Sequence, residues 1–308
     1  MANTLTASQQ KKSVNLKIWI MEARPQYLFL PVVLVFLGTA MAWNDSPFNM
    51  VYAILALVGL LLCHSSVNIL NDYFDFKSGL DLKTRQTPFS GGSGLLPAGR
   101  LKPRQVFWYG TICLILAVPV GVFFTIVQGW QLLPLLFLGV FCIVLYTTFI
   151  LKHRFPEWSP GVGLGTLPVL GAYFVQTGNY SWEAIVAAVP SGLLVTNLLL
   201  LNEFPDVEAD KTAARRTLPI TMGAKKAALV YSTLTILVYV WIIGAVITTI
   251  MPVYCLLALL TLPLAFKAMR GSFSGGDLKK LVPAMAINVI VVLGTQLLLG
   301  IGYILANL

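Results

Sequence analysis

Two short acidic motifs with the same core spacing carry the residues best suited to chemistry. The first reads NDYFDFKSGLD and begins at Asn71, and the second reads NEFPDVEADK and begins at Asn202, 131 positions later. Each contains Asn-x-x-x-Asp, which ends at Asp75 in the first motif and at Asp206 in the second. Because residues four apart lie on one face of a helix, each motif is expected to present an amide oxygen beside a carboxylate.

The two motifs together predict a metal site. The second motif extends the spacing to Asp210, although Pro205 is expected to kink or end that helix early and so loosen the alignment. Like charges at this spacing repel and lose hydration at the end of an apolar helix, so they need a counter-ion. Carboxylate and amide oxygens suit Mg²⁺, which proteins commonly bind through one or two carboxylates plus substrate phosphates. The predicted ligands are Asn71, Asp75, Asp206 and Asp210; the alternative is solvated helix ends paired with Lys and Arg.

Basic side chains near the motifs are candidates for holding phosphate oxygens, namely Arg24, Lys152, Lys211 and Arg215. Basic residues at the cytoplasmic ends of membrane helices are also expected from topology alone. The segment PFSGGSG, residues 88–94, follows the first motif, and glycine-rich backbone can turn successive N–H groups toward phosphate oxygens. It lacks the GK[ST] ending of a nucleotide-binding loop, so we expect it to cover a substrate, with a plain flexible connector as the alternative.

Four weaker candidates for the site complete the set: Asp72, Asp81, Asn202 and Tyr146. The aromatic face of Tyr146 could stabilise a carbocation, although tyrosine is also common at membrane interfaces. His64 has no carboxylate or serine spaced to match it, so it is expected to pack rather than to act as a base. Gly161, Gly163 and Gly165 either let two helices approach closely or leave room for a lipid chain.

The elements that must position these residues are membrane helices. Of the 308 residues, 57% are hydrophobic and 11% are charged, against about 25% charged in an ordinary soluble domain. This composition excludes a water-soluble globule and predicts an all-α polytopic membrane protein. The four cysteines all lie in apolar stretches without zinc or disulfide spacing. Nine apolar stretches are long enough to span a bilayer, at about 26–43, 50–70, 105–127, 131–150, 160–178, 183–203, 226–249, 252–268 and 282–305.

The distribution of the basic residues predicts how the chain is oriented in the membrane. With nine spans, all 21 Lys and Arg residues fall in the N-terminal segment and in four alternate loops. The opposite loops, near Asp45, Gln128, Gly178 and Ile250, contain none. By the positive-inside rule, the N-terminus, a tail of residues 1–23, is cytoplasmic and the C-terminus lies outside. The net charge of +9 therefore reflects topology in the cell membrane and indicates no nucleic-acid partner.

The paired motifs, set in nine spans, resemble those of the UbiA superfamily of intramembrane prenyltransferases. The similarity includes Arg24-Pro25 before the first span, Tyr146-Thr147 at the end of the fourth, and Thr217-Leu218-Pro219 through Gly223 after the second motif. The resemblance implies a bundle, residues 24–308, built from two similar four-helix halves at about 24–150 and 158–308 plus one helix. It also implies that Mg²⁺ and an isoprenoid diphosphate are bound between the motifs.

Within that superfamily the first motif resembles the menaquinone branch, whose acceptor is 1,4-dihydroxy-2-naphthoate. Many relatives have a third carboxylate four residues after the first aspartate, but this chain has Gly79 there and places the acid at Asp81. This spacing resembles the naphthoate enzymes more than those that act on 4-hydroxybenzoate. The resemblance implies Mg²⁺-dependent transfer of a polyprenyl group to an aromatic acceptor. Homogentisate, haem and glycerol phosphate lipids stay open as other acceptors.

A different class of function is an ion-coupled transporter, because acidic residues in membrane segments often mark ion pathways. Transporter sites usually lie near the middle of the membrane on interrupted helices. The acidic motifs of this chain instead lie at the basic-side ends of spans, which favours the enzyme.

Overall fold

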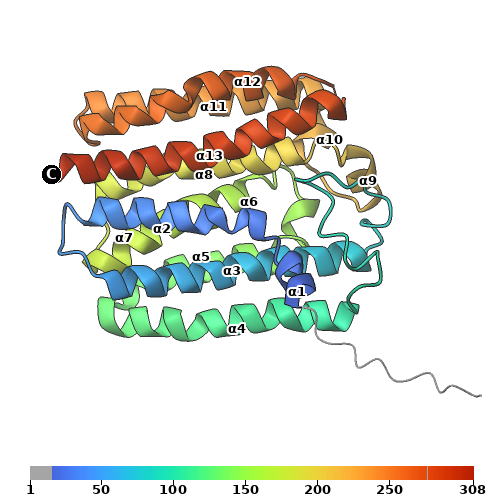
Figure 1. The fold of residues 1–308 in the computed structure, drawn as a ribbon, viewed down its shortest axis with the longest axis horizontal. Coiled ribbons are helices and arrows are strands. Elements are labelled where there is room, and N and C mark those ends of the chain that lie inside the picture. Colours follow the sequence, from blue (N-terminus) through green and yellow to red (C-terminus); the bar gives the residue numbers. More distant parts are fainter. Residues whose placement is uncertain (1–15, 276) are drawn as a thin grey trace, which may run out of the picture.

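The computed structural model describes residues 16–275 and 277–308, and within these it contains helices and no β-strand. The longer helices run side by side along one axis (Figure 1). This confirms the predicted all-α class for the described residues. The α-helices are α1 (Leu16–Glu22), α2 (Phe29–Ala42), α3 (Met50–Lys77), α4 (Pro103–Gln128), α5 (Leu133–Leu145), α6 (Trp158–Gly161), α7 (Leu167–Thr177), α8 (Trp182–Asn202), α9 (Val207–Thr212), α10 (Leu218–Met222), α11 (Ala224–Ile247), α12 (Leu262–Ser272) and α13 (Leu278–Ala306).

Short helices of other types join these elements. The 3₁₀ helices are η1 (Pro25–Tyr27), η2 (Trp130–Leu132), η3 (Ile150–Lys152) and η5 (Val253–Thr261), and η4 (Val162–Thr166) is a π-helix. π-helices are rare and often occur at functional sites.

Seven helical segments of the described chain are long and apolar enough to cross a membrane. They match seven of the nine expected spans. The expected span at 131–150 is instead a shorter apolar segment, Trp130–Leu145, and the one at 160–178 is divided among α6, η4 and α7. The structure thus supports an integral membrane protein with seven long spans, and the count of nine stays a prediction.

The glycines of α6 and η4 allow that segment to lie directly against α8. A Cβ atom on Gly165 would stand 2.6 Å from the backbone oxygen of Ser191, too close for any side chain. Gly163 faces the other way, where a Cβ would meet the Cβ of Cys142 at 2.8 Å. Close packing of helices is therefore one reason for these glycines, as expected.

The two predicted halves of the chain pack as one bundle. Helix α2 packs against α7 and α13, and α8 packs against α11 and α13. Large side chains from distant parts of the chain, such as Leu37, Ile242 and Leu299, are fully buried in one core cluster. Helices α9 and α10 lie at the end of the bundle opposite the C-terminus (Figure 1). The loop that follows α3 lies at that same end, so both acidic motifs are at one end of the bundle.

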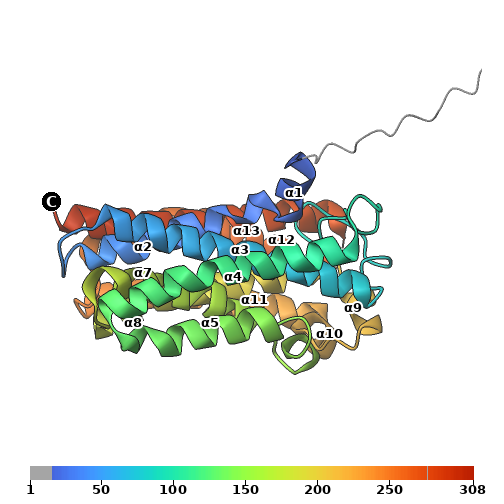
Figure 2. The same ribbon diagram turned by 90° about the horizontal axis from the view of Figure 1, so that it is seen from below.

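Part of the predicted N-terminal tail is helical. Residues 16–22 of the predicted tail form α1, which projects from the side of the bundle (Figure 2), and residues 1–15 lie outside the described part. The ring of Trp19 packs edge-on against Tyr109 of α4, with the ring centres 5.2 Å apart. Leu16, Ile20 and Met21 are exposed. This apolar surface suits a helix that lies at the membrane interface.

We expect the basic loops to share one face of the membrane. In sealed inside-out and right-side-out vesicles, Lys102→Cys and Lys279→Cys should react with a membrane-impermeant thiol reagent only from the cytoplasmic side, and Asp45→Cys only from outside. The protein without an added cysteine is the control, because it shows how much the four native cysteines react. Reaction of Lys279→Cys from outside would contradict the predicted orientation.

Candidate functional site

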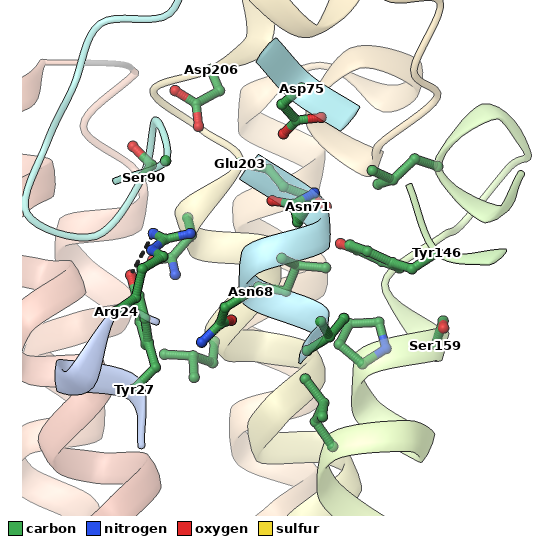
Figure 3. Close-up of a pocket in the computed structure, with 18 of the residues that line it drawn as sticks. Arg24, Tyr27, Asn68, Asn71, Asp75, Ser90, Tyr146, Ser159, Glu203 and Asp206 are labelled. Atoms are coloured by element: carbon green, nitrogen blue, oxygen red, sulfur yellow. Dashed lines mark hydrogen bonds between the residues drawn. The ribbon is translucent and has the colours of Figure 1, made fainter. Parts of the chain in front are cut away.

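A cavity of about 190 Å³ lies at the end of the bundle where the two acidic motifs meet. Both motifs line it, through the residues Asn71, Asp75, Asp81, Asn202, Asp206 and Asp210. In Figure 3, Asp75 and Asp206 lie near each other at one end of the cavity, and Asn71 and Asn68 lie progressively farther from that end along α3. The two motifs, far apart in sequence, therefore contribute to a single site.

The first wall of the cavity is a continuous helix. Helix α3 runs on to Lys77, so Asn71 and Asp75 lie on one face, as their spacing predicts. The Nδ2 atom of Asn71 donates a hydrogen bond to Oγ1 of Thr147 at 3.0 Å, which fixes the orientation of the amide. The neighbouring Tyr146 also lines the cavity.

The second wall is built differently from the first. Helix α8 ends at Asn202 and α9 begins at Val207, with Pro205 in the turn between them. The expectation that Asn202, Asp206 and Asp210 share one helix face is therefore wrong, because the proline-containing turn interrupts the helix. Instead, Asp206 is the first residue before α9, and its backbone oxygen accepts a hydrogen bond from the Asp210 N–H at 2.8 Å.

Several oxygens that face this site lack partners. The Oδ1 atoms of Asn202 and Asp206 are buried and accept no hydrogen bond from the described residues. Both carboxylate oxygens of Glu203, which lines the cavity as well, also lack a hydrogen bond from an N–H or hydroxyl, and its carboxyl lies beside that of Glu157. Buried oxygens of this kind cost free energy unless a ligand satisfies them, so the site is arranged to receive positive charge or hydrogen-bond donors.

Arg215 joins the two walls. Its guanidinium donates to the carboxylate of Asp75 from one nitrogen and to Oδ1 of Asp210, at 3.0 Å, from another. Burial disfavours the charged form, but the two carboxylates outweigh it and raise the pKa of Arg215 above its ordinary value. A planar guanidinium suits this bridging geometry because its donors lie in a fixed fork.

The remaining acids of the cavity favour a bound cation. Burial, with the Asp210 charge, raises the pKa of Asp206 to about 7. Burial, with the charges of Asp75 and Asp72, raises the pKa of Asp81 to about 8. A cation in the cavity would favour the ionised forms of both groups and lower both pKa values.

No group of three or more His, Cys, Asp or Glu side chains within residues 16–275 and 277–308 is arranged to hold a metal by itself. The donor set still fits Mg²⁺. This ion demands few protein ligands, since it keeps several waters and takes further oxygens from phosphates. The unpartnered Oδ1 of Asp206 and the nearby amide oxygen of Asn202 are ligands of the required kind.

Asp72 does not line the cavity, unlike the other acids of the first motif. It is 2% exposed. Its Oδ2 accepts the backbone N–H of Ser93 at 2.7 Å, while Oγ of Ser93 donates to Oε2 of Glu22 at 2.8 Å. Asp72 therefore anchors the glycine-rich loop to α3, and Glu22 anchors it to α1.

The glycine-rich loop lies against the cavity, as expected for a cover. Ser90, Gly91 and Gly92 line the cavity, and the hydroxyl of Tyr27 donates to the backbone oxygen of Phe89 at 2.5 Å. Gly92 adopts a φ of +70°, and a Cβ there would stand 3.3 Å from the Asp72 carboxylate. Glycine suits this position because it adopts positive φ without strain.

The four basic candidates divide into two groups. Arg24 and Arg215 line the cavity, and the guanidinium of Arg24 lies 4.7 Å from the Tyr27 ring centre and 3.9 Å from Asp72. Lys152 and Lys211 are exposed and are not among the lining residues. Lys211 pairs with Glu208 at 2.7 Å. The geometry gives these two lysines no part in the site.

Sequence reasoning missed several lining residues: Tyr27, His64, Asn68, Ser159 and Glu203. A signal was present for two of them, because His64 and Asn68 precede Asn71 and Asp75 at spacings of three and four along one helix face. Ser159 has no such signal, since it reaches the cavity only through the packing of α6.

A second cavity, of about 400 Å³, adjoins the first. It is lined almost wholly by apolar side chains of α3, α4, α5 and α7. Three residues, Ile143, Gly163 and Leu164, line both cavities. A polar chamber and an apolar chamber therefore meet at Gly163, within the π-helix η4.

Comparisons with known proteins agree with this arrangement. A family model described as the UbiA prenyltransferase family matches residues 30–292. The chain is 29% identical to a 1,4-dihydroxy-2-naphthoate octaprenyltransferase of Bacillus subtilis, over 85% of this chain and 84% of that protein. It is 31% identical to the protein of the same name from Haemophilus influenzae, over 71% and 74%. A UbiA homolog from Archaeoglobus fulgidus, bound to GPP and Mg²⁺, has a similar fold, with a TM-score of 0.62, 12% identity, and coverage of 93% of this chain and 99% of that one.

Proposed function

Because the chain belongs to the UbiA prenyltransferase family, we propose that it transfers a polyprenyl group from a polyprenyl diphosphate to 1,4-dihydroxy-2-naphthoate, with Mg²⁺. Relatives that share most of its length are named for this acceptor. The observation that carries the proposal is the junction of an acidic cavity with an apolar one at Gly163. A polyprenyl diphosphate has the same two parts, a charged head and a hydrocarbon chain.

The diphosphate head fits the end of the cavity that holds the acidic motifs. Asn71, Asp75, Asp206 and Asp210 would hold Mg²⁺, and Arg24 and Arg215 would contact phosphate oxygens. When bound, Mg²⁺ neutralises charge on the departing diphosphate. Arg215 adds fixed positive charge at the same place, which stabilises the leaving group without reorganisation.

The hydrocarbon chain fits the second cavity. Its lining is almost wholly apolar, so the chain would be kept from water there, and burial of apolar surface away from water is favourable. The allylic carbon would then lie between the two chambers, near Tyr146. The face of an aromatic ring stabilises a cation, so Tyr146 would stabilise the positive charge that develops as the C–O bond breaks.

In this proposal the electron-rich ring of the acceptor attacks the allylic carbon. A C–C bond forms, the diphosphate leaves with the electron pair of the C–O bond, and a naphthoate acceptor releases its carboxyl group as CO₂. The product is a demethylmenaquinol. With the basic loops in the cytoplasm, both polar substrates reach the site from that side.

Identification of the product tests the proposal. Purified protein with Mg²⁺ and an octaprenyl or geranyl diphosphate should convert 1,4-dihydroxy-2-naphthoate to a prenylated, decarboxylated product identified by mass. Mn²⁺ should replace Mg²⁺, Ca²⁺ should serve poorly, and excess chelator should stop the reaction. Transfer to 4-hydroxybenzoate or homogentisate alone would reassign the acceptor, and full turnover in chelator would contradict the role of the metal.

We expect Gly163→Leu to restrict the enzyme to donors with shorter prenyl chains. The larger side chain would narrow the junction of the two cavities, because even a Cβ at this position meets Cys142. The kcat/KM ratio for octaprenyl over geranyl diphosphate should fall about tenfold or more, as expected for a misfit of a few methylene groups. Gly244→Leu is the control, because Gly244 is exposed, has no atom within 4 Å of its Cβ position and lines neither cavity. Equal loss for both donors would contradict this path for the chain.

A further inference from the structure

Two polar side chains remain unused at the inner end of the cavity. His64 of α3 and Ser159 of α6 line it, and they are 3% and 1% exposed. Nδ1 of His64 has no hydrogen-bond partner among the described residues. Oγ of Ser159 has none there apart from the sulfur of Cys142, which is a weak acceptor. Both groups are thus desolvated without a strong partner, which is unfavourable unless a ligand supplies one.

These two residues lie away from the diphosphate end. His64 precedes Asn71 by seven residues, which is about 10 Å along a helix axis, and it precedes Asp75 by eleven. Ser159 lies well below Asp75 and Asp206 in Figure 3. It belongs to the segment that leads into the π-helix η4, next to Gly163, where the apolar chamber begins.

The imidazole of His64 and the hydroxyl of Ser159 match neither part of the donor. A hydrocarbon chain would leave an imidazole nitrogen and a hydroxyl unsatisfied. A diphosphate needs cationic partners. Arg215 provides one at the other end, between the acidic motifs, and the guanidinium of Arg24 faces Asp72 and Tyr27. A neutral imidazole and a hydroxyl instead match the hydroxyl or carboxylate groups of a substituted aromatic ring.

We propose that His64 and Ser159 form the subsite that binds the polar substituents of the aromatic acceptor. The subsite rests on the proposed function and gives a partner to the two polar groups at the inner end that neither part of the donor satisfies. The ring of the acceptor then packs on the apolar side chains of Ile143 and Leu164, which line the cavity beside Gly163. This position sets the ring between the diphosphate end and the apolar chamber.

The test compares acceptor and donor binding in four variants of the full-length protein. His64→Leu and Ser159→Ala remove one polar group each, and His64→Gln retains a hydrogen-bonding side chain. Ser65→Ala, the neighbouring residue that lines neither cavity, is the matched control. The readouts are steady-state KM values for each substrate, and equilibrium binding of 1,4-dihydroxy-2-naphthoate alone and of geranyl diphosphate with Mg²⁺.

His64→Leu should weaken acceptor binding about tenfold or more and Ser159→Ala about fivefold, as expected for loss of a buried hydrogen bond. The donor KM should stay within twofold, and His64→Gln should recover part of the acceptor affinity. Unchanged acceptor binding in both single variants, or an equal rise in donor KM, would overturn the subsite. If the unmodified protein prenylates no aromatic acid at all, the proposed function itself fails, which is a separate result.

Discussion

Asp206→Asn is expected to lower the rate of prenyl transfer by about a thousandfold or more, the scale on which loss of charge stabilisation acts in active sites. The substitution keeps the shape of the side chain and removes only its charge. Asp206 takes no part in the Arg215 ion pairs, and its Oδ1 has no partner in the described chain. The melting temperature should therefore change little while the activity is lost.

The control for this prediction is Glu208→Gln, in the same motif. Glu208 is 86% exposed and pairs only with the exposed Lys211 among the described residues. Its substitution should leave the rate unchanged. Asp75→Asn should show a loss like that of Asp206→Asn, and the double variant should be scarcely slower than either, because residues that act as a unit are not additive. Independent multiplication of the two losses would separate the motifs into different sites.

Arg215→Ala is expected to have the largest effect on stability, about 3–5 kcal/mol, which is typical when one partner of a buried ion pair is removed. It leaves the buried carboxylates of Asp75 and Asp210 facing each other without the guanidinium. Thermal unfolding in detergent measures the loss. Arg216→Ala, an exposed neighbour, should change the free energy of unfolding by less than about 0.5 kcal/mol.

A second measurement separates the charge of Arg215 from its packing. Mg²⁺ alone should stabilise Arg215→Ala more than it stabilises the unmodified protein, because the bound cation then replaces missing positive charge. Equal stabilisation of both proteins would show that the two acidic motifs do not depend on a shared cation.

The long spans and the first acidic wall could be predicted from sequence because their signals are local. Apolar stretches of about 20 residues admit few other structures in a membrane protein, and the four-residue spacing of Asn71 and Asp75 acts within one helix. Pro205 predicted that the helix of the second wall would be interrupted, although no local signal predicted the conformation of the turn. The metal role of both walls stays a prediction.

Other assignments depended on packing between distant segments and could not be made from spacing. Arg215 and Lys211 are four residues apart and equally basic, yet only Arg215 turns into the cavity. Asp72 is adjacent to Asn71, but it points to the loop at Ser93. His64 was expected to pack because no carboxylate or serine is spaced along the sequence to match it; Ser159, which also lines its cavity, comes from the other half of the chain.

The ion pair between Asp75 and Arg215 can form only late in the synthesis of the chain. The two residues are 140 positions apart, so at 5–20 residues per second the ribosome needs roughly 7–28 s to make the second after the first. During that interval the Asp75 carboxylate lacks its ion-pair partner Arg215. Its place two residues before the end of α3 keeps it near water, where a lone charge is tolerated, until α9 and the segment after it reach the same surface. The position of the motif at a helix end therefore serves insertion of the nascent chain as well as the finished site.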